Sequence, residues 1–225
     1  MYARTLATFC LLTSSLSAAT AGSPERGVAV SLRLRSGALR AAASDEMRKE
    51  LAALMLTAGV TSTWQDPNDY RDVSGYTVVV DLEGDCNVPP HAEAVPPREG
   101  TPLGSTAVAE NHPLPFVKVS CNVLSALLAP FTADQPDAFR DFVLGRAIGR
   151  VLAHELYHIL AQSEEHSGWG VAKAALSGAD LMNSRFEFNE MALDRIHAPK
   201  TAESTPAAFD SGAGSAYVDT AADGK

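Results

Sequence analysis

Two histidines and a glutamate stand at a spacing that suits metal-dependent hydrolysis. The segment His154-Glu155-Leu156-Tyr157-His158 lies within an apolar stretch that has a helical pattern. On a helix, residues four apart share one face, so both imidazoles can bind a single metal ion. Glu155 lies about 100° around the helix from His154, where its carboxylate can hold a water molecule beside that ion. In zinc peptidases this pattern supplies two zinc ligands and a general base.

The helix that carries these residues is predicted to run from Asp134 to Gln162. Asp134 is expected to cap it, and a proline two residues later is tolerated in the first turn. Apolar residues cover most of its circumference, so the helix is expected to be largely buried. The remaining stripe is predicted to carry Arg146, Arg150 and Tyr157. Gly145 and Gly149 are expected to permit close packing. A purely structural interpretation stays open, in which core hydrogen bonds satisfy the two histidines.

A catalytic zinc site usually takes three protein ligands, and the sequence leaves three candidates for the third. His166 comes eight residues after His158, and a turn of the chain can return it to the same metal. Glu190 stands in an Asn-Glu-Met-Ala-Leu-Asp segment that resembles the Asn-Glu-x-x-x-Asp of thermolysin-like gluzincins. Glu164 is the third candidate. We favour His166.

Short motifs between Val78 and Leu181 add to this interpretation. They are Gly84-Asp85-Cys86, Leu103-Gly104, Leu114 to Cys121, Gly145 to His158, His166-Ser167-Gly168 and Ser177 to Leu181. Together they resemble a family of secreted, largely uncharacterised bacterial HExxH proteins. The resemblance covers about half of the chain, and its motifs outside the helix are short. It implies a metzincin-like zinc hydrolase with His166 as the third ligand.

The chain departs from the metzincin pattern in two places. That pattern is His-Glu-x-x-His-x-x-Gly-x-x-His, and here Ala161 and Glu164 occupy its glycine and final histidine positions. Relatives often carry a methionine in the turn after the third histidine, where this chain has Val171-Ala172. Met182 is then the candidate for the Met-turn, unless the chain has none.

The ends and the cysteines indicate an exported protein. Residues 1–21 read as a secretory signal peptide, with Arg4 in its positive region and a small-residue cleavage site. Removing this leader removes Cys10 and leaves Cys86 and Cys121, for which we expect a disulfide. Closing a loop of about 35 residues stabilises a chain by roughly 3–4 kcal/mol in the chain-entropy model. Two buried thiols are the alternative. The predicted localisation is secreted or periplasmic.

Composition limits the partners. The net charge of −9 and the lack of a polybasic run argue against nucleic acid, which binds mainly through basic contacts to phosphate. No stable membrane insertion is expected after the leader is cleaved. The apolar content of 46% suits a single domain with a proper core, predicted over residues 22–197. Residues 198–225 are small and polar and are predicted to form a disordered tail.

The pattern of elements predicts an α+β fold. Strands are expected over 28–35 and 76–82, helices over 44–58 and 187–196, a loop over 88–101, a hairpin from 106–108 and 116–121, and a turn over 168–175. The resemblance implies a zincin-like arrangement of these elements. Such a fold has a small mixed sheet with an edge strand over a cleft, a long central active-site helix and a short C-terminal helical part.

We therefore predict a secreted zinc metallopeptidase that acts on a peptide or protein substrate. Zn²⁺ is the expected cofactor, with ligands His154, His158 and His166, and Glu155 is the expected general base. Two alternatives remain, namely an inactive zinc-binding interaction protein and a zinc amidase that acts on a non-peptide amide. Trp169 is expected either to wall a substrate pocket or to pack on the core. The other histidines are expected at the surface; they are His91, His112 and His197.

Overall fold

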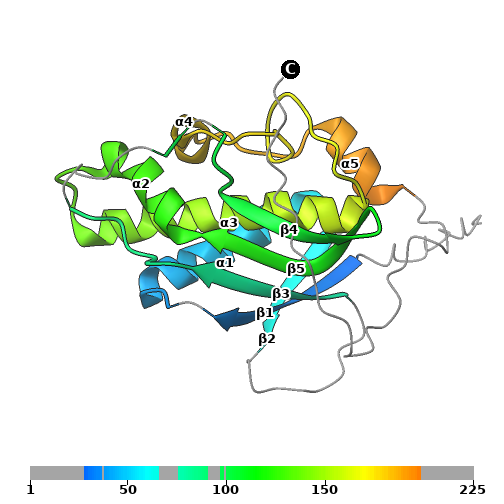
Figure 1. The fold of residues 1–225 in the computed structure, drawn as a ribbon, viewed down its shortest axis with the longest axis horizontal. Coiled ribbons are helices and arrows are strands. Elements are labelled where there is room, and N and C mark those ends of the chain that lie inside the picture. Colours follow the sequence, from blue (N-terminus) through cyan, green and yellow to red (C-terminus); the bar gives the residue numbers. More distant parts are fainter. Residues whose placement is uncertain (1–27, 37, 66–75, 91–96, 99, 199–225) are drawn as a thin grey trace, which may run out of the picture.

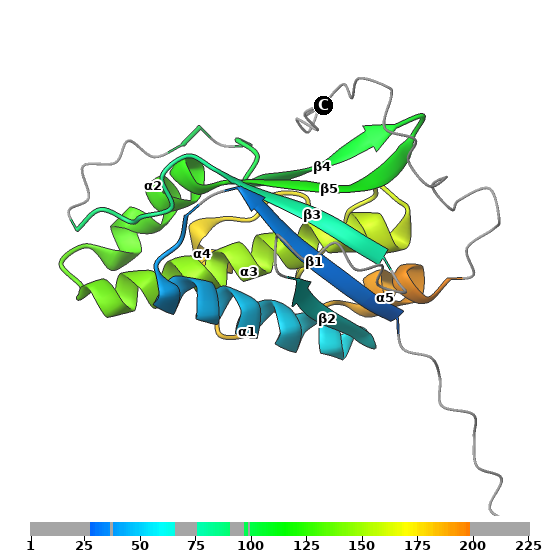
Figure 2. The same ribbon diagram turned by 90° about the horizontal axis from the view of Figure 1, so that it is seen from below.

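The computed structural model describes residues 28–36, 38–65, 76–90, 97–98 and 100–198. These residues form a five-stranded mixed sheet and five helices, which is the α+β class that the sequence predicts. Helices α1 (Ala41–Thr57) and α3 (Asp137–Ala161) lie side by side along one face of the sheet (Figures 1 and 2). The predicted leader, the predicted tail beyond Ala198, and His91 lie outside the described residues.

The first unit of the fold runs from β1 (Val28–Ser36) through α1 to β2 (Val60–Gln65), and the two strands pair in parallel. β1 confirms the predicted strand, whereas the largely polar sequence of β2 does not predict one. α1 begins three residues before Ser44, the predicted cap, because a run of alanines favours helix there. The helix ends as predicted, before Gly59, whose φ is +66°.

The sheet has the strand order β2-β1-β3-β5-β4. β3 (Tyr76–Glu83) and β5 (His112–Ser120) run parallel to β1, and only β4 (Gly104–Ala109) is antiparallel. β4 and β5 confirm the predicted hairpin. Glu110 and Asn111 form its two-residue turn with φ values of +50° and +65°, as a tight hairpin requires. The hairpin thus places β4 at the edge of the sheet, next to α3.

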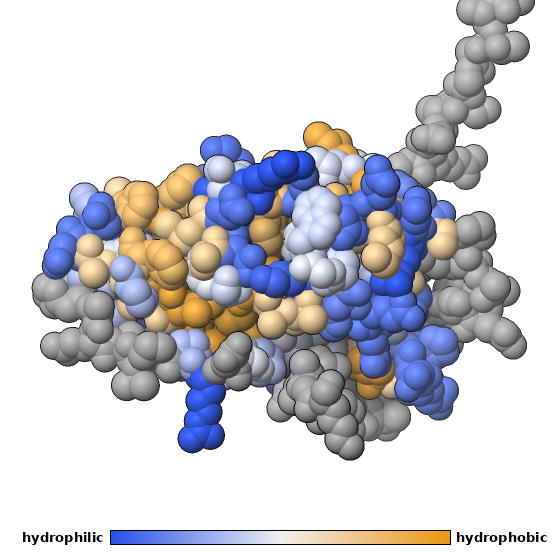
Figure 3. All heavy atoms as spheres, turned by 90° about the horizontal axis from the view of Figure 1, so that it is seen from above, coloured by the Kyte–Doolittle hydropathy of each residue, from blue (hydrophilic) through white to orange (hydrophobic). Residues whose placement is uncertain are grey.

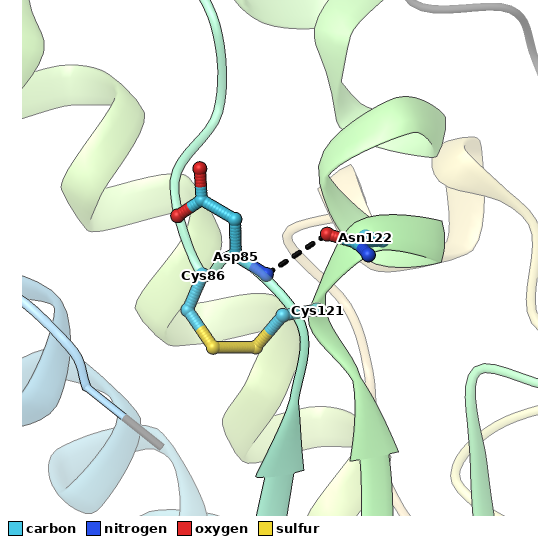
Figure 4. The surroundings of a disulfide bond; sticks show 4 residues. All are labelled: Asp85, Cys86, Cys121 and Asn122. Carbon is cyan, nitrogen blue, oxygen red and sulfur yellow. Dashed lines mark hydrogen bonds between the residues drawn. A yellow bond between two sulfur atoms is a disulfide. The ribbon is translucent and has the colours of Figure 1, made fainter.

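A disulfide joins Cys86 to Cys121, as the sequence predicts (Figure 4). It links the loop after β3 to the first residue of α2 (Cys121–Thr132). Beside it, the backbone N–H of Asp85 donates to the Asn122 side chain over 2.9 Å. The sequence pattern does not predict α2, since Pro130 lies inside it and interrupts the helical signal.

Helix α3 carries the HExxH segment but begins later than predicted. Asp134 has a φ of +59°, outside the helical region, so it does not cap the helix, which starts after Pro136. The predicted polar stripe is wrong for two residues, since Arg150 and Tyr157 are 1% and 0% exposed. Arg150 is buried because α1 packs along α3 and supplies Glu50, whose carboxylate lies 2.7 Å from the guanidinium. The prediction that Gly145 permits close packing is confirmed, because a Cβ there would collide with the backbone of α1.

The chain ends in two short helices, α4 (Gly178–Met182) and α5 (Glu190–His197). α5 starts later than the predicted 187–196 because the Asn189 side chain accepts the N–H of Ala192 and caps it. Figure 3 views the molecule from the side on which α4 and α5 lie. Hydrophobic residues gather toward the α2 end of that face and hydrophilic ones toward the α5 end. Within the described ranges, no helix combines the length and the apolar character needed to span a bilayer.

Candidate metal centre

His154 and His158 lie one turn apart near the C-terminal end of α3, and both are buried. Their Nε2 atoms face each other at 3.1 Å. The other nitrogen of each ring contacts a backbone carbonyl. The Nδ1 of His154 lies 2.7 Å from the carbonyl oxygen of Val171. The Nδ1 of His158 lies 2.7 Å from the carbonyl oxygen of Ser163. The two backbone carbonyls therefore set the orientation of both imidazoles.

These contacts also fix the proton on each ring. A carbonyl oxygen only accepts hydrogen bonds, so both Nδ1 atoms must carry the hydrogen and both Nε2 atoms keep a lone pair. Burial lowers the pKa of His154 to about 3 and that of His158 to about 4, so neither ring is charged near neutral pH. Two lone pairs that face each other at 3.1 Å repel unless a cation lies between them. The two facing lone pairs thus suit a bound metal ion better than the alternative in which core hydrogen bonds satisfy the two histidines.

His166 completes the group. It lies on the segment that leaves α3 and turns back, residues 163–176, which we call the return loop. The ligand atoms of the three histidines all lie within 4.8 Å of one another, close enough to hold a metal ion. For comparison, nitrogens bound tetrahedrally to zinc at about 2.0–2.1 Å are about 3.3 Å apart. Partial desolvation by the neighbouring groups lowers the pKa of His166 too, which favours its neutral form.

Glu155 is 5% exposed and lies beside the histidines, facing β4. Its Oε2 accepts a hydrogen bond of 2.7 Å from the hydroxyl of Thr106. Burial raises the pKa of Glu155 to about 7, and the Thr106 hydrogen bond opposes that rise. Gly104 leaves room for the other oxygen, because a Cβ there would lie 2.9 Å from Oε1 and 2.7 Å from Val151 Cγ1. A side chain at Gly104 would push the edge strand away from the carboxylate.

A cavity of about 290 Å³ opens over these groups. One wall comes from the segment before β4 and from the β4–β5 hairpin, and the other comes from the return loop. Its lining residues outside the histidines and Glu155 are mostly small or apolar; they include Leu103, Gly104, Thr106, Val108, Val151 and Leu176. The hairpin is tied to the end of α3, since the Gln162 amide donates to the carbonyl of Pro113 over 3.2 Å. The cavity is an open cleft whose lining includes the three histidines and Glu155.

The other candidate ligands lie apart from this group or at its rim. Glu164 is exposed and lines the cavity. Glu190 is exposed in the first turn of α5 and is not among the residues that line it. Met182 lies in α4, packed against the hydrophobic core, and the described lining residues include no methionine. The structure thus brings His166, rather than Glu190, to the helical pair.

The remaining aromatic and imidazole side chains lie away from the cleft. Trp169 is 52% exposed and borders a separate pocket with Arg185 and Phe186, so it neither walls the cleft nor packs in the core. His112 is exposed, as predicted. His197 is also exposed, and its Nε2 lies 2.9 Å from the carbonyl oxygen of Ala58.

Sequence reasoning misses four contributors to the site. Two are backbone carbonyls, those of Ser163 and Val171, which no side-chain pattern can indicate. The other two, Gly104 and Thr106, have a usable signal. Residues two apart on a strand point to the same side, and Gly104, Thr106 and Val108 all line the cleft. A glycine and a hydroxyl two residues apart thus mark the partners of Glu155, although the predicted strand, 106–108, begins after that glycine.

Comparisons with protein-family models, with curated proteins and with solved structures found no match to this chain.

Proposed function

We propose that the protein is a zinc-dependent metallopeptidase of the zincin type. The observation that carries the proposal is the pair of Nε2 lone pairs on His154 and His158, fixed toward each other by two backbone carbonyls. His166 adds a third imidazole, and Glu155 adds a buried carboxylate next to them. Three neutral nitrogen ligands with an open cleft above suit catalytic zinc, which keeps one position free of protein.

Zinc held by these residues would supply a Lewis acid that lowers the pKa of a water molecule toward 7. Glu155 would accept the proton of that water as the oxygen attacks the substrate carbonyl. The same carboxyl group would then donate the proton to the leaving amine, which completes hydrolysis of the amide bond. The Thr106 hydroxyl holds the carboxylate in place throughout.

The edge strand supports a peptide as the substrate. β4 is the edge strand of the described sheet, with β5 as its neighbour, and its residues Gly104, Thr106 and Val108 line the cleft. An extended peptide can add to such an edge through backbone hydrogen bonds, which would lay its amide bond across the histidines. The disulfide supports an oxidising compartment, so we place the enzyme outside the cytoplasm, secreted or periplasmic.

Replacing Glu155 by Gln tests the proposal. The variant should bind zinc at one ion per chain but lose about 10²–10⁴-fold in peptide hydrolysis, because a general base is removed without removing a ligand. Zinc content and cleavage of a peptide library are measured on the full chain. Glu190→Gln is the matched control, and it should keep both metal and activity.

Two results would contradict the proposal. A wild-type chain that binds zinc and cleaves nothing in the library would favour an interaction protein. Loss of metal in Glu190→Gln would instead make that glutamate the third ligand.

A further inference from the structure

The third histidine is held differently from the other two. α3 ends at Ala161, and Gln162 adopts a left-handed conformation with a φ of +50°, so the chain turns away from the helix axis. His166 follows in a segment that is neither helix nor strand, and its side chain is exposed. Something other than regular backbone hydrogen bonding must hold it over the helical pair.

Tyr157 provides one such contact. Its ring is fully buried on α3, between the two histidines in sequence, and its hydroxyl donates to the carbonyl oxygen of Glu165 over 2.9 Å. The direction of this bond is set by Arg195, whose Nη1 lies 3.0 Å from the same hydroxyl. A guanidinium only donates, so the hydroxyl accepts from Arg195 and gives its own hydrogen to the carbonyl. The residue just before His166 is thereby fastened to α3.

The residue just after His166 is fastened as well. The backbone N–H of Ser167 donates to the carbonyl of Ala172 over 2.7 Å. Ala172 follows Val171, whose carbonyl orients His154. The peptide units on both sides of His166 are therefore anchored, one by a side chain of α3 and one by the backbone that also fixes a helical ligand.

Arg195 extends this arrangement to the last helix. It lies on α5 and forms an ion pair with the Glu165 carboxylate in addition to its hydrogen bond to the Tyr157 hydroxyl. A single guanidinium thus contacts both the hydroxyl that holds the return loop and the side chain of the loop residue that is held. α5 thus contacts both the helix that carries the histidine pair and the loop that carries His166.

We propose that Tyr157, supported by Arg195, is a positioning residue for His166 and so sets the metal affinity of the centre. This inference rests on the proposed function in one respect, since it requires the three histidines to bind zinc. Outer hydrogen bonds that orient metal ligands typically change metal affinity by about 10–100-fold when removed. The Tyr157 hydroxyl acts one residue away from its ligand, through the backbone, and we expect a loss at the lower end of that range.

Tyr157→Phe removes only the hydroxyl and keeps the buried ring. On the full chain, zinc affinity is measured by competition with a chromophoric chelator, and the visible absorption of the Co²⁺-loaded protein reports the ligand geometry. The variant should bind zinc about 10-fold more weakly and give an altered Co²⁺ spectrum. Thr132→Val is the matched control, since it removes a buried hydroxyl that donates to a carbonyl, over 3.1 Å, in α2. It should leave both readouts unchanged.

Arg195→Met gives a second test that leaves the buried ring untouched. It removes the guanidinium and keeps much of the aliphatic stem, and it should weaken zinc binding in the same direction but less. If both variants match the wild type in zinc affinity and Co²⁺ spectrum, the positioning role is overturned while the metal centre stands. If the wild type itself binds no zinc, or His154→Ala binds as well as the wild type, the proposed function fails instead.

Discussion

The two halves of the candidate metal centre are built in opposite ways. His154 and His158 stand on a regular helix whose backbone bonds are local, and both rings are buried. His166 stands on the return loop, is exposed, and depends on contacts from α3, α5 and the loop itself. Sequence spacing places His154 and His158 on one face of α3, whereas tertiary contacts determine the position of His166. The difference implies that disturbing the loop displaces His166 first, while the helical pair stays on one face of α3 and loses only the carbonyls that orient its rings.

Removing one ligand from each half gives the largest expected effect. His154→Ala should lower zinc affinity by more than about 100-fold, because the two remaining ligands lie on different elements. His166→Ala should cost less, since the helical pair stays in place. Titration of each metal-free variant with zinc measures both, and exposed His112→Ala should behave as the wild type. Equal losses for the two ligand variants, or the reverse order, would break the comparison.

Two glycine substitutions of similar steric severity, one on α3 and one on the return loop, sharpen the comparison between the helical half and the loop half. Gly170 has a φ of +76°, and a Cβ there would strike the carbonyl of Glu187, while a Cβ at Gly145 would strike that of Ala43. Each change to Ala should destabilise the fold by about 1–3 kcal/mol through overpacking or strain. Only Gly170→Ala should also weaken zinc binding, by about 10-fold, since it shifts the adjoining Val171 carbonyl. Thermal unfolding of the metal-free chains and zinc titration separate the two effects.

If Gly145→Ala weakens zinc binding as much as Gly170→Ala, the helical half depends on its packing against α1 as strongly as the loop half depends on its own conformation.

The smallest effect is expected from the exposed ion pair. Glu165→Ala removes a carboxylate whose side chain is 70% exposed but keeps the backbone carbonyl that Tyr157 contacts. Surface ion pairs contribute about 0–1 kcal/mol, so stability and zinc affinity should both change little. Zinc titration at low and high salt provides the measurement. A loss as large as that of Tyr157→Phe would mean that charge, rather than the hydroxyl, holds the loop.

The same division explains what the sequence can predict. The spacing of His154 and His158, the β-branched run of β3 and the turn at Glu110–Asn111 are local signals, and each corresponds to an observed element. The choice among His166, Glu164 and Glu190 depends on how a loop folds back, which no local pattern encodes. The sequence alone therefore leaves three candidates there.

Tertiary contacts also explain the errors along the helices. Arg150 reads as a surface residue, yet Glu50 from α1 and two backbone carbonyls of α4 satisfy its guanidinium in the core. Tyr157 reads the same way, yet Glu165 and Arg195 satisfy its hydroxyl. Both errors come from partners that lie outside α3, which the periodicity of the helix does not register.

The disulfide has a consequence for the integrity of the molecule. Cys86 and Cys121 are 35 positions apart, and the whole β4–β5 hairpin lies between them. A single cut of the backbone anywhere within that interval leaves both fragments covalently joined. The segment that forms one side of the cleft would therefore stay attached after a nick by a neighbouring protease, a hazard for any chain exported among such enzymes.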